Sequence, residues 1–447
     1  MSSATETAPF VARTEFPVAP RTLEESGLSL DLILQLSLKT LHFAGELTGA
    51  ELSQRLGLNF AVIEPVLELL IQQRQVEIAG GTMVGRASYR YRISDAGRAR
   101  AVFFLESNHY VGIAPVPFDQ YRRYMLNVRK SLSRRDATRE KVRDAFKHLV
   151  IGQHVLDQLG PAINAGHSMF VYGPPGNGKT VIAQAIRKLL EGDLAIPHAI
   201  EVEGAIIRVF DPVSHEPLEQ EEEVEADQSL DLGERPDRRW IRCKRPMVMV
   251  GGELTLDALE LNYNPSTKFY RAPVQAIANG GVLVIDDFGR QQCAPRDLLN
   301  RWIVPLESRV DFLTLQSGQK VELPFMVLVV FATNIKPAEL VDEAFLRRIH
   351  YKVFAESPTV AEFSQIFENV CRERKLDFDK KFVEHLLQNY YKPRKIALRG
   401  CQPRDLLTQV LSLAEYRALP RAITPELLDA ACASYFVDEQ ESPVLYS

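Results

Sequence analysis

The beginning of the chain places apolar and polar residues with the spacing of helices. Apolar side chains at 28–41 predict a helix with a wide apolar face. A shorter helix is predicted at 51–56, because Thr48 and Glu51 form the capping-box pattern that begins a helix. A third helix is predicted at 59–74, where apolar residues again recur every three to four positions.

Short runs with the character of strands follow the third helix. Strands are predicted at 76–79 and 88–93, on either side of a Gly-Gly turn. Three helices followed by a two-stranded hairpin resemble a winged helix-turn-helix domain, which would span 23–100. Before it, residues 1–22 are rich in Ser, Thr, Ala and Pro and are expected to form a disordered arm.

The candidate recognition helix carries carboxylates where DNA contact would require hydrogen-bond donors. Glu64 and Glu68 are expected on its exposed face, where they would repel phosphate. The predicted wing does carry Arg86, Arg90 and Arg92. We therefore expect this domain to contact a protein client or adaptor, and DNA binding is the alternative.

Residues 101–147 are expected to form a basic linker. Pro115 and Pro117 interrupt regular structure, and ten basic against three acidic residues at 121–147 give that stretch a net charge of +7. We interpret it as a solvated helical face that leads into the next domain. The alternative is contact with an anion, either nucleic acid or the acidic run at 219–227, which holds six acids and no base.

A phosphate-binding loop follows an apolar, strand-like run at 169–172. Its glycines would turn backbone N–H groups inward around phosphate oxygens, and the helix that follows adds a positive dipole end. In this pattern the lysine reaches the β- and γ-phosphates and the threonine hydroxyl binds Mg²⁺. The residues concerned are Gly173, Pro174, Pro175, Gly176, Asn177, Gly178, Lys179 and Thr180, with Val181 next in the helix.

Two further apolar runs end in polar side chains that suit the same site. The run at 280–285 ends in Asp286 and Asp287, the first suited to hold magnesium and the second to polarise the attacking water. The run at 325–332 leads to Asn334. If both runs are central parallel strands, Asn334 would lie beside the phosphates and hydrogen-bond the attacking water or the γ-phosphate. A hairpin is predicted just before it, at 310–323.

Together these motifs resemble the AAA+ ATPase family, from about residue 149 to 438. Ile151 and Gly152 stand where the family contacts adenine, Arg347 and Arg348 resemble its arginine finger, and Arg404 resembles its lid arginine, sensor 2. The hairpin before Asn334 is similar to that of the MoxR-type branch.

This resemblance implies a fold, a reaction and an assembly. The fold would be an α/β P-loop core, a parallel sheet flanked by helices, at 148–354, with an acidic insert at about 213–240 and a helical lid at 355–440. ATP and Mg²⁺ would be the cofactors, and a homo-oligomeric ring, most simply a hexamer, would remodel a protein client. Arg348, or else Arg347, would reach a neighbour's ATP.

One departure from the family affects the expected rate. Asp287 stands where the family usually has Glu, so its carboxylate is one methylene shorter. A misplacement of about 1 Å can cost roughly a hundredfold in rate. The alternatives are therefore an ATP-binding switch with very slow turnover, or a nucleotide-regulated DNA-binding protein.

Composition limits the class of protein further. The 447 residues suit about three domains, and 46% hydrophobic with 25% charged residues excludes a wholly disordered or fibrous chain. A net charge of −5 argues against a general nucleic-acid binder. No stretch approaches the ~20 apolar residues of a membrane span, so no membrane insertion is expected. Five widely spaced cysteines without a Cys-x-x-Cys pair indicate a reducing, cytoplasmic location.

Overall fold

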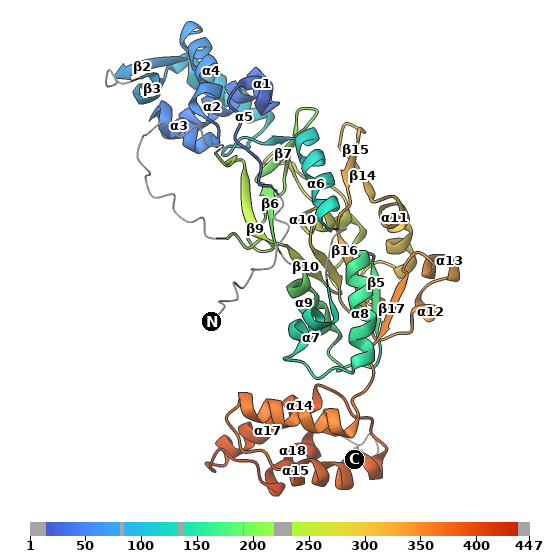
Figure 1. Ribbon diagram of the computed structural model, residues 1–447. Helices are drawn as coiled ribbons and strands as arrows, with labels where there is room; N and C mark the ends of the chain where they lie inside the picture. Colours follow the sequence, from blue (N-terminus) through green and yellow to red (C-terminus); the bar gives the residue numbers. More distant parts are fainter. Residues whose placement is uncertain (1–14, 81–84, 133–136, 191, 219–234, 437–447) are drawn as a thin grey trace, which may run out of the picture.

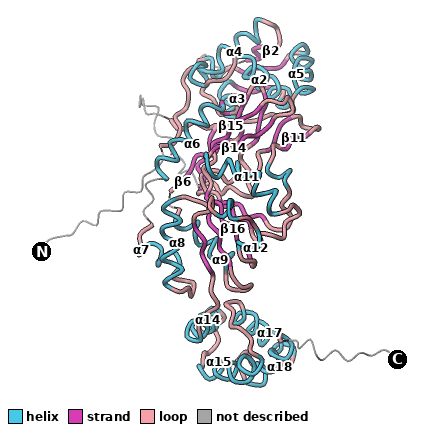
Figure 2. The backbone as a smooth tube through the Cα atoms, turned by 90° about the vertical axis from the view of Figure 1, so that its right-hand side faces the viewer, coloured by secondary structure: helices cyan, strands magenta, loops and turns pink. Residues whose placement is uncertain are grey.

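The computed structural model describes residues 15–80, 85–132, 137–190, 192–218 and 235–436. The molecule is elongated, with an N-terminal domain at one end, a helical domain at the other and an α/β core between them (Figure 1). A view turned by 90° shows the same succession (Figure 2). Within these ranges, no helix combines the length and the apolar character needed to cross a bilayer.

Two of the expected segments fall largely outside the described residues. The acidic run at 219–227 does so entirely, and the N-terminal arm does so up to residue 14. The end of that arm is described, and Val18 forms an antiparallel bridge with Pro236. Residues 15–22 therefore lie against the protein rather than extending freely from it.

The N-terminal domain consists of helices around a three-stranded antiparallel sheet of order β1-β3-β2. The predicted capping box of Thr48 and Glu51 is present at the start of α3. The three predicted helices and the two predicted strands are present as α2, α3, α4, β2 and β3, with one further short strand, β1, after α2. The elements are α1 (Leu23–Ser26), α2 (Leu30–Ala44), β1 (Glu46–Thr48), α3 (Gly49–Leu56), α4 (Phe60–Gln72), β2 (Val76–Gly80), η1 (Arg86–Ser88), β3 (Arg90–Ile93) and α5 (Asp95–Ser107).

The core is a five-stranded parallel sheet of order β10-β13-β16-β5-β17. Successive residues of β5 enter two clusters, because side chains alternate across a strand: Met169 and Val171 pack towards α8 and α9, and Phe170 towards Trp302 of α11. This parallel sheet with helices on both faces confirms the predicted α/β P-loop fold. Its strands are β5 (Met169–Tyr172), β10 (Met247–Val250), β13 (Val282–Ile285), β16 (Leu328–Thr333) and β17 (Tyr351–Phe354).

Helices cover both faces of this sheet. Those on the first cluster are α7 (Arg139–Phe146), α8 (Gln153–Ala165) and α9 (Lys179–Leu189), and α11 (Pro295–Ser308) covers the second. Two short helices, α12 (Pro337–Leu340) and α13 (Glu343–Leu346), lie between β16 and β17. The predicted hairpin is present as β14 (Val310–Thr314) and β15 (Lys320–Pro324), paired antiparallel.

A second, mixed sheet lies between the core and the N-terminal domain, and we call it the insert sheet. It has the order β11-β12-β8-β7-β4 and is accompanied by an antiparallel pair, β6 with β9. The elements are β4 (Val116–Pro117), β6 (Asp193–Pro197), β7 (Ala199–Val202), β8 (Ala205–Arg208), β9 (Trp240–Lys244), η2 (Leu256–Leu259), β11 (Asn262–Asn264), β12 (Phe269–Arg271) and α10 (Val274–Ile277).

The segment predicted as a basic linker is instead packed structure. Residues 101–107 complete α5, and α6 (Phe118–Leu132) runs beside β15 and β7. The apolar residues Tyr121, Tyr124 and Val128 recur at helical spacing and are buried with Trp240. Pro115 and Pro117 suggested an irregular segment, but both lie before α6 and do not interrupt it. The apolar stripe of the helix determines how this segment packs.

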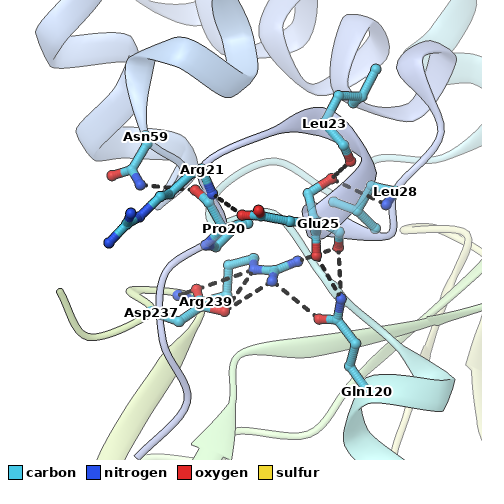
Figure 3. A network of polar contacts seen from close by, with 10 residues as sticks. Pro20, Arg21, Leu23, Glu25, Leu28, Asn59, Gln120, Asp237 and Arg239 are labelled. Carbon is cyan, nitrogen blue, oxygen red and sulfur yellow. Dashed lines mark hydrogen bonds and ion pairs between the residues drawn. The ribbon is translucent and has the colours of Figure 1, made fainter. Parts of the chain in front are cut away.

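A buried ion pair joins the insert to the N-terminal domain (Figure 3). Asp237 and Arg239 each expose only 2% of their side chains, and Arg239 Nη2 lies 2.9 Å from Asp237 Oδ2. Arg239 Nη1 donates to the Ser26 carbonyl at 2.9 Å, and its Nη2 donates to Gln120 Oε1 at 3.1 Å. The N-terminal domain is thus tied to both the insert and α6.

The C-terminal domain is helical, as predicted for a lid. Its core is formed by apolar residues of the packed helices, among them Phe363, Leu406 and Leu428. The elements are α14 (Val360–Glu373), α15 (Lys380–Leu386), a π-helical turn η3 (Leu387–Tyr391), α16 (Lys392–Arg394), α17 (Gln402–Tyr416) and α18 (Pro425–Tyr435).

Candidate nucleotide-binding site

The predicted phosphate loop connects β5 to α9 at the carboxyl end of the parallel sheet. Gly173 has a φ of 146°, and a Cβ there would lie 2.4 Å from the Ala355 carbonyl oxygen, so only glycine fits. Gly178 has a φ of 72° and immediately precedes α9. The loop therefore has the backbone freedom that a phosphate cradle at a helix N-terminus requires.

Lys179 is held inside the loop. Its side chain is buried, and Nζ donates to the carbonyl oxygens of Gly173 at 3.0 Å and Pro174 at 2.9 Å. Burial lowers the pKa of Lys179, an effect that the carboxylates of Asp287 and Asp286 oppose. A bound phosphate would offer this amine stronger acceptors than two neutral carbonyls.

Thr180 and Asp286 form a pair that suits a magnesium ion. Thr180 Oγ1 donates to Asp286 Oδ2 at 2.8 Å, although the two residues are far apart in the sequence. Magnesium prefers hard oxygen ligands and commonly takes only one or two carboxylates, with substrate phosphates and water completing its shell. A hydroxyl and a single carboxylate beside the phosphate loop fit that requirement. No cluster of three His, Cys, Asp or Glu side chains arranged for a metal occurs in the described part of the chain.

Asp287 and Asn334 meet at the ends of β13 and β16. Asn334 Nδ2 donates to Asp287 Oδ1 at 3.0 Å. Asp287 has a φ of 48°, a left-handed conformation that Asp adopts more readily than most residues. This turn directs the carboxylate towards Asn334, and Gln291 Nε2 supports it by donating to the Asp286 carbonyl at 2.9 Å. Sequence reasoning missed Gln291, which lies in the loop after β13.

A cleft beside the phosphate loop lies between the core and the helical domain. Ile151 and Gly152 line it, together with Asn177 from the loop and Ile366 and Gly400 from the helical domain. The two residues predicted to contact adenine thus lie next to the loop predicted to hold the phosphates. Sequence reasoning did not identify Ile366 or Gly400 as residues of this cleft.

Three consecutive residues of the helical domain, Arg399, Gly400 and Cys401, form hydrogen bonds with the phosphate loop. Arg399 Nη1 donates to the Pro175 carbonyl at 2.6 Å, and Gly400 N donates to Asn177 Oδ1 at 3.3 Å. Cys401 N donates to the Gly176 carbonyl at 2.8 Å. Arg399 was not predicted; its position just before Gly400 and the Gln-Pro-Arg motif was the available signal.

The three predicted arginines lie in different surroundings. Arg404 has 65% of its side chain exposed and pairs with the adjacent Asp405 at 3.5 Å rather than with the phosphate loop. Arg347 pairs with Glu343 on α13 at 2.9 Å, and Arg348 Nε pairs with Glu307 on α11 at 2.5 Å. Arg399, rather than Arg404, is the lid arginine that contacts the phosphate loop here, and it does so through the Pro175 carbonyl.

The wing arginines of the N-terminal domain are paired with carboxylates. Arg86 forms ion pairs with Glu64 and Glu68 of α4. Arg90 and Arg92 both pair with Glu46, at 3.3 Å and 2.7 Å. Each of these three arginines is therefore paired with a carboxylate of its own domain.

Comparisons with known proteins agree with this nucleotide site. Residues 147–225 match the family model of magnesium chelatase, subunit ChlI, and residues 359–434 match a domain of unknown function, DUF8689. No curated protein matches the chain.

Solved structures that match part of the chain include RuvB and NtrX. The RuvB Holliday junction branch migration motor of Thermotoga maritima has 15% identity and a TM-score of 0.37, over 64% of this chain and 71% of RuvB. NtrX from Brucella abortus has 15% identity and a TM-score of 0.38, over 75% of this chain and 67% of NtrX. The phosphate loop in its strand–loop–helix setting, the parallel sheet beside it and the ChlI match over residues 147–225 support the resemblance of this chain to the AAA+ ATPase family.

Proposed function

We propose that this protein hydrolyses ATP with Mg²⁺ in a homo-oligomeric ring of six subunits and uses the cycle to remodel a protein client or complex. The observation that carries the proposal is the pair of side-chain contacts beside the phosphate loop. Thr180 meets Asp286 at 2.8 Å, and Asn334 meets Asp287 at 3.0 Å. If these strand ends had only a structural role, neither the Thr180–Asp286 pair nor the Asn334–Asp287 pair would be required beside the loop that carries Lys179.

Each residue has a part in the proposed reaction. Lys179 would exchange the two loop carbonyls for oxygens of the β- and γ-phosphates. Thr180 and Asp286 would hold the magnesium ion, which neutralises charge on the phosphates when bound. Asp287 would accept a proton from the attacking water, and Asn334 would fix the direction of the Asp287 carboxylate.

The position of the lid would depend on whether nucleotide is bound. Arg399 already contacts the phosphate loop, and Arg404, at the start of α17, would have to turn from Asp405 to reach a phosphate. Filling the cleft between Ile151 and Gly400 would separate or reorient the two domains that line it. This is the movement that we propose performs work on the client.

A neighbouring subunit would complete the site. An arginine suits this role because its planar, permanently charged group stabilises the charge of a transferring phosphoryl group. Arg348 is our first candidate and Arg347 the second. Arg348 would have to leave Glu307, and Arg347 would have to leave Glu343. Assembly of the ring would therefore release one of these ion pairs.

The N-terminal domain is proposed to hold a protein client or adaptor. Pairing of Arg86, Arg90 and Arg92 with carboxylates argues against the alternative of a DNA-binding wing. All five cysteines are free thiols, which suits the cytoplasmic location that we propose.

Phosphate release from ATP by the purified full chain tests the proposal. We expect magnesium-dependent release that Asp287→Ala reduces by roughly a hundredfold or more, while ATP binding persists. Binding without release would instead support the nucleotide switch. Release that Asp287→Ala leaves unchanged would refute the assigned role of that residue. An Asp287→Asn variant loaded with ATP should then retain the client in a pulldown.

A further inference from the structure

A row of donor side chains crosses three strands of the insert sheet. Asn262 of β11 is paired with Arg271 of β12, and Arg271 is paired with Arg208 of β8. Paired residues project from the same face of a sheet, and neighbouring strands lie about 4.8 Å apart. The three side chains therefore form a row roughly 10 Å long on one face.

Within the part of the chain that the structure describes, the two arginines of this row have no partner for their charge. Both are exposed, as is Asn262, and neither guanidinium forms an ion pair or hydrogen bond with the described residues. Like charges directly across from each other on neighbouring strands disfavour a sheet. The repulsion between Arg208 and Arg271 therefore disfavours this part of the sheet when no ligand is bound. An anion bound between the two guanidinium groups would remove the repulsion.

The row borders a cavity of about 560 Å³, which lies within the usual range for small-molecule sites. Asn262, Arg271 and Arg208 all line it. Phe210 and Val213 supply apolar surface in the same cavity, and Val213 is 92% exposed. The cavity thus offers both charged donors and an apolar wall.

Three acidic residues line the cavity, and within the described residues none forms an ion pair with Arg208 or Arg271. Asp211 accepts a hydrogen bond from Ser214 Oγ at 2.7 Å, and Glu260 is paired with Arg301 at 2.6 Å. Asp257 is the third acid of the lining. In the described part of the chain, neither arginine is therefore neutralised by a direct ion pair with any of these three acids.

The charge of Arg208 also affects a neighbouring histidine, His198. His198 precedes β7, and the pKa of its imidazole is lowered first by burial and then by the charge of Arg208. Binding of an anion to Arg208 would oppose the second effect. His198 is therefore a natural reporter of occupancy.

We propose that this cavity binds a small ligand that carries a phosphate or carboxylate group. Arg208 and Arg271 would hold the oxyanion, because guanidinium groups match the geometry of both groups and form strong charge-assisted hydrogen bonds. Asn262 would orient a second polar atom, and Phe210 would pack against the apolar part of the ligand. The site lies in the insert, distinct from the phosphate loop.

The test uses the full chain carrying Lys179→Ala, so that the phosphate loop does not compete for the probe. Inorganic phosphate and succinate are titrated separately while the His198 ring is followed by NMR. We expect a saturable shift and a higher apparent pKa of His198 with at least one probe. Replacing both arginines (Arg208→Gln with Arg271→Gln) should abolish the saturable response. Arg296→Gln, an exposed arginine on α11, should leave it intact.

Two further measurements use a variant that conserves the charge and a peptide from the same chain. Arg208→Lys keeps the charge but loses the planar fork, and it should weaken binding several-fold in a chain that folds normally. A synthetic peptide of residues 219–227 tests whether the acidic run of the same chain occupies the row. Binding of that peptide with no saturable response to either probe would overturn the proposal, as would a response that the double variant retains.

Discussion

The amide of Asn334 donates to the carboxylate of Asp287 across the ends of two neighbouring parallel strands, with 3.0 Å between Nδ2 and Oδ1. The contact fixes one carboxylate oxygen and leaves the other to accept a proton. It also explains how a side chain one methylene shorter than Glu is held in a defined direction. The left-handed backbone of Asp287 points the side chain, and Asn334 secures it.

Removal of the Asn334 amide should slow hydrolysis without abolishing nucleotide binding. We expect Asn334→Ala to lower the rate of phosphate release by roughly ten- to a hundredfold, because loss of one preorganised donor in an active site typically costs about that much or more. Steady-state ATPase kinetics at saturating ATP measure the effect. An unchanged rate would show that the hydrogen bond has no part in catalysis.

Loss of the Lys179 amine should weaken nucleotide binding itself. Lys179→Ala removes the buried cation that would face the β- and γ-phosphates, so affinity for ATP should fall at least tenfold, and affinity for adenosine should change little. Calorimetric titration with the two ligands separates these effects. Equal losses for both ligands would instead indicate a damaged fold.

The lid arginines should differ in what they contribute. Arg399→Ala removes the bond to the Pro175 carbonyl and should loosen the lid in the absence of nucleotide. Arg404→Ala should leave the empty protein unchanged, since that side chain is exposed and pairs only loosely with Asp405. Hydrogen exchange at residues 174–178, with and without ATP, distinguishes them. Identical exchange in the two variants without ATP would contradict this division.

The buried pair in the insert should be essential to stability. Arg239→Ala leaves Asp237 as an unpaired buried charge, and removal of one partner from such a pair typically costs about 3–5 kcal/mol. Chemical denaturation of the full chain measures the loss. As a control, Arg372→Ala breaks the exposed pair with Glu368 on α14, which should cost no more than about 0.5 kcal/mol.

Removal of magnesium should separate binding from hydrolysis. With one carboxylate and one hydroxyl at the proposed metal position, the protein alone is a weak ligand for the ion, and ATP supplies the remaining oxygens. We expect excess EDTA to abolish phosphate release and added Mg²⁺ to restore it fully. Persistent release in EDTA would show that the measured activity comes from another source.

The nucleotide site was largely predictable because its chemistry is local in the sequence. The phosphate loop is one continuous motif, and Asp286 and Asn334 end apolar runs whose strands then align in parallel. The hydrogen-bond partners of individual side chains could not be predicted from the sequence in this way. Arg399 donates to the carbonyl of Pro175, which is distant in the chain, and Gln291 donates to the carbonyl of the nearby Asp286. Nothing in a sequence shows which carbonyl a side chain will reach.

The segment at 101–147 was misread for a physical reason. Its charge suggested a solvated surface, yet a helix can be strongly basic on one side and buried on the other. Tyr121, Tyr124 and Val128 gave that periodic signal within the same residues as the arginines. The partner they required, Trp240, lies more than a hundred positions later, so burial became evident only in the folded structure.

The pairing of Asp237 with Arg239 has a consequence for the modularity of this protein. The N-terminal core also includes Ala199 and Ile206 of the insert sheet, so the two units share one hydrophobic interior. A chimera that exchanges residues 23–100 alone would expose that interior and leave the Arg239 guanidinium without the Ser26 carbonyl. We therefore expect the N-terminal domain and the insert to behave as one structural unit attached to the nucleotide-binding core.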